Sequence, residues 1–128
     1  MERWLGRYAE VAYALMRFVI GALLAGHGAQ KLFGALGGKA MTSDPMMLVA
    51  GIIEFFGGLM VAVGLLAGFA AFLASGLMAA AYFMVHAPQG FWPIINKGEL
   101  AVAYCFVFLY IACRGSGAYS LDRAMRRR

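Results

Sequence analysis

A small set of polar and ionisable side chains stands inside, or at the ends of, long apolar stretches of this sequence. An unpaired charge in hydrocarbon is unfavourable by several kcal/mol, so such residues face the protein interior, a hydrated cavity or an interface. Carboxylates and imidazoles there can accept or relay protons, and the cations can neutralise an anion or polarise a carbonyl group. The candidates for ligand binding or proton relay are Arg17, His27, Lys31, Glu54, His86, Asn96 and Glu99.

The composition places these candidates in a membrane. Of the 128 residues, 63% are hydrophobic and only 13% are charged, and the mean hydropathy is +0.77. A soluble domain has about 25% charged residues, so we expect an integral membrane protein that contacts the lipid bilayer. Most of the basic residues are arginines near the two termini. That pattern indicates a topology signal and argues against nucleic-acid binding, because the basic tail has no interleaved aromatic residues.

Four apolar segments are the expected transmembrane helices around these candidates. We expect an all-α membrane protein, a four-transmembrane-helix bundle forming one domain over residues 1–128. The stretch 46–87 is twice the length of one crossing, and its expected bend lies between Gly64 and Gly68. The last segment is the shortest, because its apolar core from Leu100 to Cys113 has only 14 residues. The predicted helices cover approximately residues 11–33, 46–64, 68–87 and 97–114.

The distribution of basic residues predicts the orientation of these helices. Cytoplasmic flanks of transmembrane helices carry an excess of lysine and arginine. With both termini inside, seven basic residues flank the helices on the cytoplasmic side and three on the outer side, which favours cytoplasmic termini. The inner residues are Arg3, Arg7, Arg114, Arg123, Arg126, Arg127 and Arg128, and the outer ones are Lys31, Lys39 and Lys97.

Helical spacing then brings most of the candidates together. All of them except Arg17 fall in the outer half of the bundle, which predicts a polar pocket near the extracytoplasmic face. Arg17 lies deeper, and its long side chain is expected to reach toward Glu54. Glycines on the same faces mark close helix packing. The expected inner faces carry Arg17, Gly21, Leu24, Gly28 and Lys31 on the first helix, and Asn96, Glu99, Ala103, Phe106, Tyr110 and Cys113 on the last.

Each candidate also has a purely structural interpretation. Glu54 could form an ion pair with Arg17 or Lys31 that only fixes helix packing. His86 could be an interfacial histidine, and Lys97 and Glu99 could be solvated helix ends. No Glu-x-x-His or His-x-x-x-His spacing is present, so no metal site is expected. The sequence also lacks a phosphate loop, a Cys-x-x-Cys pair and a haem attachment motif, so any electron carrier would be a quinone or belong to a partner protein.

Four short motifs, in order, give the sequence a family resemblance. It resembles the DoxX family of small four-helix membrane proteins over nearly its whole length. Lys97 departs from the pattern, because the family often has glycine there. The motifs are Arg17 and Gly21 followed by Gly28-Ala29-Gln30-Lys31, then Gly51-x-x-Glu54-x-x-Gly57-Gly58, then Asn96-Lys97-Gly98-Glu99, and finally Gly115-Ser116-Gly117-Ala118-Tyr119-Ser120-Leu121-Asp122.

The resemblance implies a multi-pass protein of the cell inner (plasma) membrane linked to redox or sulfur metabolism. One member is the small subunit of a thiosulfate:quinone oxidoreductase, and others are associated with membrane complexes that handle oxidative stress. Our first hypothesis is a redox-associated subunit that binds a quinone or a small polar or sulfur ligand in the outer pocket, with a redox protein as partner. The alternatives are a non-enzymatic scaffold or assembly subunit, or a bundle that binds a lipid or small solute. The glycine- and alanine-rich helices would also suit a homo-oligomer.

Overall fold

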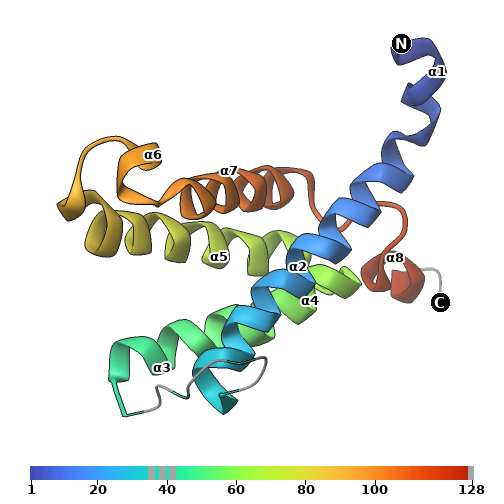
Figure 1. Ribbon diagram of the computed structural model, residues 1–128. Coiled ribbons are helices and arrows are strands. Elements are labelled where there is room, and N and C mark those ends of the chain that lie inside the picture. The colour runs from blue at the N-terminus through green and yellow to red at the C-terminus, as the bar shows by residue number, and fades with distance from the viewer. Residues whose placement is uncertain (35–36, 38–39, 41–42, 127–128) are drawn as a thin grey trace.

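The computed structural model describes residues 1–34, 37, 40 and 43–126, without the side chains of Asn96 and Arg126 (Figure 1). Within these residues every regular element is a helix. The elements are α1 (Glu2–Leu5), η1 (Gly6–Tyr8), α2 (Ala9–Phe33), α3 (Pro45–Ile52), η2 (Ile53–Gly57), α4 (Gly58–Val63), α5 (Ala67–Ala81), η3 (Tyr82–His86), η4 (Ala87–Gln89), α6 (Pro93–Asn96), α7 (Glu99–Arg114) and α8 (Leu121–Arg126).

Three continuous helical stretches of the described chain are long and apolar enough to cross a membrane. They cover Glu2–Phe33, Pro45–Val63 and Ala67–Gln89, with 32, 19 and 23 residues. Many of their large apolar side chains, such as Phe18, Phe56 and Phe72, are exposed, which is the arrangement that lipid contact favours. Helix α7 has 16 residues and is shorter than the usual span of about 20 residues.

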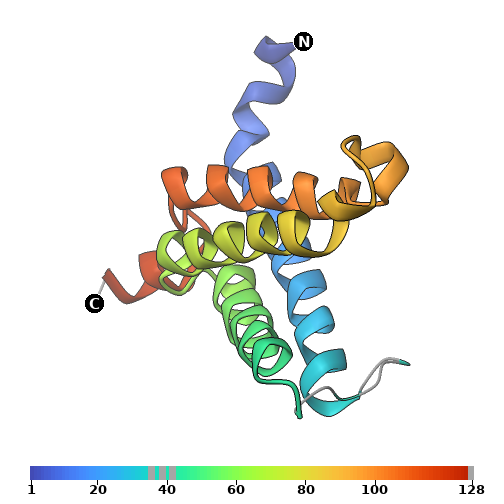
Figure 2. The same cartoon turned by 90° about the vertical axis from the view of Figure 1, so that its left-hand side faces the viewer.

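The helices form two pairs that meet at one end and separate at the other. Helix α2 packs on the continuous segment α3–η2–α4, and α5 packs on α7. The pairs join at the tight turn between α4 and α5 and diverge toward α3 and η3, as two perpendicular views show (Figures 1 and 2). The turn contains Gly64 at φ +77° and Leu66 at φ +47°, so the expected bend is where the sequence placed it.

Glycines allow the first pair to pack backbone against backbone. A Cβ atom added to Gly28 would lie 2.3 Å from the backbone nitrogen of Phe55, and one added to Gly21 would lie 2.5 Å from that of Ala62. In the other direction, a Cβ on Gly58 would lie 2.5 Å from the nitrogen of Ala25. The predicted close approach at these glycines is therefore confirmed, and it holds α2 against η2 and α4.

Two of the helical stretches contain a π-helical turn. Residues Ile53–Gly57 form η2 and Tyr82–His86 form η3. A π turn places more residues in each turn than an α-helix, interrupts the regular ladder and often occurs at functional sites. Each of the two turns carries one candidate residue, Glu54 and His86. At the start of α3, Asp44 accepts a hydrogen bond from the Met46 nitrogen at 3.0 Å, which confirms the expected cap before Pro45.

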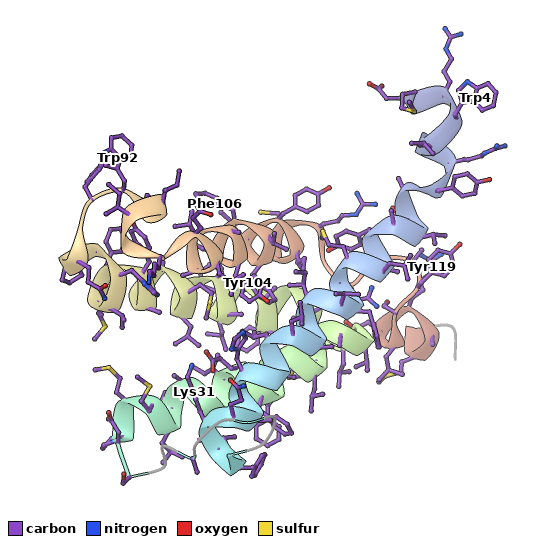
Figure 3. All side chains as sticks on the ribbon, in the orientation of Figure 1. Trp4, Lys31, Trp92, Tyr104, Phe106 and Tyr119 are labelled. Carbon is purple, nitrogen blue, oxygen red and sulfur yellow. The ribbon has the colours of Figure 1, made fainter. Side chains whose placement is uncertain are left out.

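The inner face of α7 differs from the predicted one. Its buried residues are Tyr104, Phe108 and Ile111. The expected inner face is wrong, because its members with a described side chain, Glu99, Ala103, Phe106, Tyr110 and Cys113, are all exposed. Figure 3 shows Phe106 on the side of α7 that faces away from α5. The physical reason is that lipid is as apolar as a protein core, so apolar periodicity alone does not distinguish the two faces of a membrane helix.

Candidate functional site

The centre of the candidate site is an ion pair between α2 and η2. The Nζ atom of Lys31 lies 2.6 Å from Oε1 and 2.7 Å from Oε2 of Glu54. The Glu54 side chain is only 4% exposed and that of Lys31 is 24% exposed. Glu54 therefore pairs with Lys31 and not with Arg17, the other cation that the sequence offered. A buried carboxylate needs such a partner because burial removes its hydration.

A polar cavity of about 220 Å³ lies on one side of Glu54. It is located between the two helix pairs and receives side chains from α2, η2, α5, η3 and α7. Of the predicted site residues, His27, Glu54 and His86 line it together. The full lining consists of Leu24, His27, Glu54, Met78, Ala81, His86, Lys97, Leu100, Ala101 and Tyr104.

An apolar groove of about 640 Å³ is lined by the same residue, Glu54. It runs between α3 and the end of α5 with η3, where the two pairs separate (Figure 1). Glu54, Ala81 and His86 line both the groove and the polar cavity, so these residues form the boundary between them. The groove is lined by Lys31, Pro45, Met46, Met47, Val49, Ala50, Glu54, Leu77, Ala80, Ala81, Met84, Val85 and His86.

Aromatic rings position the two histidines. The ring of His27 on α2 lies edge-on to that of Tyr104 on α7, with 6.4 Å between centroids. The ring of His86 is stacked on Tyr82 with a centroid distance of 6.3 Å. The Tyr82 hydroxyl donates to the Phe91 carbonyl at 3.0 Å, which ties η3 to the following loop.

Arg17 belongs to a different part of the molecule. It is 3% exposed, and its guanidinium donates to four backbone carbonyls rather than reaching Glu54. The acceptors are Val61 at 2.9 Å and Ala62 at 3.5 Å in α4, and Ser116 at 2.6 Å and Tyr119 at 2.9 Å in the segment after α7. The expected reach toward Glu54 is therefore wrong, because these carbonyls, at the end where the helix pairs join, satisfy the guanidinium first.

The residues around Arg17 attach the C-terminal segment to the α4–α5 turn. The Asp122 carboxylate accepts hydrogen bonds from the Leu66 nitrogen at 2.8 Å and from the Ser116 hydroxyl at 2.7 Å. The Asp122 nitrogen donates to the Gly64 carbonyl at 3.1 Å, and the Ala67 nitrogen donates to the Ser116 hydroxyl at 3.2 Å. This network gives the Ser-Leu-Asp ending of the sequence a structural role.

Lys97, in the loop before α7, is exposed, in keeping with the expected solvated helix end, and it also lines the polar cavity. Its φ of +62° explains why glycine is the alternative residue at this point of the motif. Glu99 is exposed and lies beside Trp92 and Ile95, outside the cavity. The side chain of Asn96 is outside the described part of the chain.

Tyr104 and Lys97 are the polar residues of the cavity that sequence reasoning left out of the site. A tyrosine in an apolar helix is more often a packing residue, and Tyr104, five residues after Glu99, does not share its helical face, so its spacing gave no signal. Within the described residues, no three His, Cys, Asp or Glu side chains gather closely enough to hold a metal ion. The arrangement offers one cation, one carboxylate, two imidazoles and a phenol around a small cavity, next to a larger apolar groove that is lined by a second cation, Lys31.

The fold and the site are those of an all-helical membrane protein with a buried ion pair beside a cavity. The chain belongs to the DoxX family, whose family model matches residues 12–87. It is also 41% identical over 125 residues to an uncharacterized protein of Haemophilus influenzae, with 92% of this chain and 93% of the relative covered. No solved structure matches the chain. The family match contains both partners of the ion pair and both π turns, and it ends before the loop that carries Lys97.

Proposed function

We propose that this protein is a multi-pass subunit of the cell inner membrane that binds a quinone, or a small ligand of similar polarity, between its two helix pairs. In this proposal α7 is a fourth span and both termini are cytoplasmic. The ligand then lies in the outer half of the bilayer. The electrons come from a redox partner protein, since the chain carries no motif for an electron carrier of its own.

The position of Glu54 carries the proposal. Its carboxylate is nearly inaccessible, yet the residue lines both the polar cavity and the apolar groove. A quinone has a polar ring and an apolar isoprenoid chain, and the two spaces suit these two parts. The ring would enter the cavity, and the chain would lie in the groove among Met46, Met47 and Met84, whose flexible side chains adapt to irregular ligands.

The residues around the cavity suit proton-coupled binding. Lys31 lines the groove, and it can donate a hydrogen bond to a quinone carbonyl at the boundary between groove and cavity and so stabilise negative charge that develops on that oxygen. Glu54 and His27 can hold or pass on the protons that a quinone takes up on reduction, since proton relays inside membranes use such groups. Tyr104 places the His27 ring. The DoxX resemblance, with its quinone-linked member, points to the same ligand class.

Ligand binding by matched variants tests this proposal. The purified protein in lipid nanodiscs is titrated with decylubiquinone, and separately with thiosulfate, and the Kd is compared with that of Glu54→Gln. We expect at least a tenfold weaker quinone Kd in this variant, or about 1.4 kcal/mol. Glu99→Gln makes the same chemical change outside the cavity and should leave the Kd unchanged. Equal affinity of the Glu54→Gln variant and the wild type would remove the proposed site.

A scaffold role is the second candidate, and one observation favours it. Lys31–Glu54 and Arg17 each connect elements that are far apart in sequence, as a structural network would. In that case Glu54→Gln lowers the thermal stability, and neither this variant nor the wild type binds the quinone. The same titration therefore separates the two roles, and lipid carried through purification in the groove would favour the third hypothesis, a lipid-binding bundle.

A further inference from the structure

A second polar hollow lies at the opposite end of the molecule, where the two helix pairs join. It has a volume of about 550 Å³ and is lined by Glu10, Arg114, Arg123 and residues 115–118. These residues come from the start of α2, the end of α7, the loop after it and the start of α8. The hollow shares no lining residue with the polar cavity or the apolar groove, so the proposed quinone site does not account for it.

The loop in this hollow already holds one carboxylate. Glu10 forms an ion pair with Arg114, and its Oε2 atom accepts a hydrogen bond from the Ala118 nitrogen at 3.4 Å. Gly117 has a φ of +84°, and the backbone N–H group of the next residue, Ala118, points to this carboxylate. The geometry thus favours oxygen anions at this loop.

The hollow has a surplus of positive charge. Glu10 balances Arg114, and the Asp122 carboxylate is engaged by Leu66 and Ser116. The Arg123 side chain lines the hollow and is exposed, and it makes no ion pair or hydrogen bond with the described residues. One guanidinium is therefore available for an anion that enters from outside the protein.

The surroundings of the hollow indicate that this anion belongs to a lipid. Arg114 ends the apolar helix α7, so the hollow lies where the hydrocarbon gives way to the headgroup layer. Exposed apolar side chains continue along both helices from the hollow: Val11 directly follows Glu10 on α2, and Leu15 on α2 and Leu109 on α7 lie five residues from Glu10 and Arg114. These side chains can contact acyl chains while the arginines contact a phosphate. A small soluble anion has no apolar part that could contact these side chains.

We propose that this hollow binds the phosphate of an anionic phospholipid, with Arg123 and Arg114 as the charged ligands. Arginine suits phosphate because its planar guanidinium forms two parallel hydrogen bonds. Basic pockets on the cytoplasmic side of membrane proteins bind anionic headgroups in this way. Bound lipid would connect α2, α7 and the C-terminal segment, in addition to the contacts made by Arg17.

Native mass spectrometry of the full-length protein in detergent tests this site. The protein is titrated with phosphatidylglycerol and, in parallel, with phosphatidylcholine. We expect tighter binding of phosphatidylglycerol, and about a fivefold weaker affinity for Arg123→Gln, from the usual contribution of one basic residue near a lipid surface. Arg123→Lys keeps the charge and should retain most of the affinity. Arg3→Gln removes the same charge from α1, away from the hollow, and should have no effect.

Three results would overturn the proposal. Equal affinity for the two lipids would show that the protein does not distinguish a negative headgroup from a neutral one. An equal loss of phosphatidylglycerol affinity in Arg3→Gln and Arg123→Gln would show a diffuse electrostatic attraction without a specific site. Competition by inorganic phosphate as effective as that by phosphatidylglycerol would show a site for a soluble anion instead. None of these outcomes depends on quinone binding, so this proposal and the proposed function fail separately.

Discussion

The ammonium group of Lys31 contacts both carboxylate oxygens of Glu54, at 2.6 and 2.7 Å, and this contact joins α2 to the π turn η2. The pair is the only ion pair among the described residues in which a carboxylate is almost fully buried. Its Lys31 side faces the groove and its Glu54 side faces both hollow spaces. A ligand that accepts a hydrogen bond from Lys31 must therefore displace one Glu54 oxygen from the ammonium group, or use the ammonium N–H that does not point to Glu54.

Removing both partners of this pair should destabilise the protein by less than the sum of the two single losses. Lys31→Gln leaves a buried carboxylate without its cation, and we expect a loss of about 3 kcal/mol in the free energy of unfolding. In the double variant with Glu54→Gln no charge is left unpaired, so the losses should fall short of additivity by about 1–3 kcal/mol. Thermal unfolding of the four proteins in mild detergent measures this coupling.

The Glu10–Arg114 pair is the matched control for this cycle. Its side chains are 43% and 35% exposed, so solvent screens the charges and we expect a coupling below about 1 kcal/mol. Additive losses for Lys31→Gln and Glu54→Gln would contradict the buried pair, and equal coupling in both cycles would show that burial has no influence on it.

Replacing Arg17 should release the C-terminal segment. Arg17→Gln loses the donors to Ser116 and Tyr119 as well as those to α4, and we expect a destabilisation of roughly 3 kcal/mol. Hydrogen exchange at residues 115–122 should speed up more than exchange in α5, because that segment depends on Arg17. Arg7→Gln is the control, since Arg7 is exposed at the N-terminal end. Unchanged exchange at 115–122 in Arg17→Gln would refute the attachment.

Enlarging a single glycine should separate α2 from η2. In Gly28→Ala the new methyl group would lie 2.3 Å from the Phe55 nitrogen, so the helices must move apart, at a cost of about 2 kcal/mol or more. Gly76→Ala is the matched control, because nothing lies within 4 Å of its added Cβ in α5, and alanine favours helix. Thermal stability should fall only in Gly28→Ala, and similar values for the two variants would argue against backbone contact at Gly28.

Part of this arrangement follows from the sequence in physical terms. Regular spacing identifies the inner face of α2, because its glycines and its two long cations recur at helical intervals. Asp44 before Pro45 identifies the start of α3, because the cap depends on local chemistry. The pairing of Lys31 with Glu54 was one of two alternatives, since both cations share one face and only the register between helices decides which one meets the carboxylate.

The Arg17 contacts, the π turns and the inner face of α7 could not be predicted, because no local sequence pattern marks them. The acceptors for Arg17 are backbone carbonyls of Ser116 and Tyr119, and every residue type offers the same carbonyl, so no side chain marks them. The π turns at Glu54 and His86 have no marker in the sequence, which contains neither proline nor a run of polar residues there. The inner face of α7 is hidden for a related reason, since lipid and protein interior accept the same side chains.

Helix α7 should cross the membrane as a fourth span. Its 16 residues give a helix of about 24 Å, against about 30 Å of hydrocarbon, so a crossing needs local thinning or help from Ile94 and Ile95. The basic residues favour it, because they place Arg114 and Arg123 on the cytoplasmic side. We expect a fusion of alkaline phosphatase after Trp92 to be active and green fluorescent protein after Arg128 to fluoresce. Both reporters in one compartment would mean three spans, and the C-terminal arginines would then lie outside.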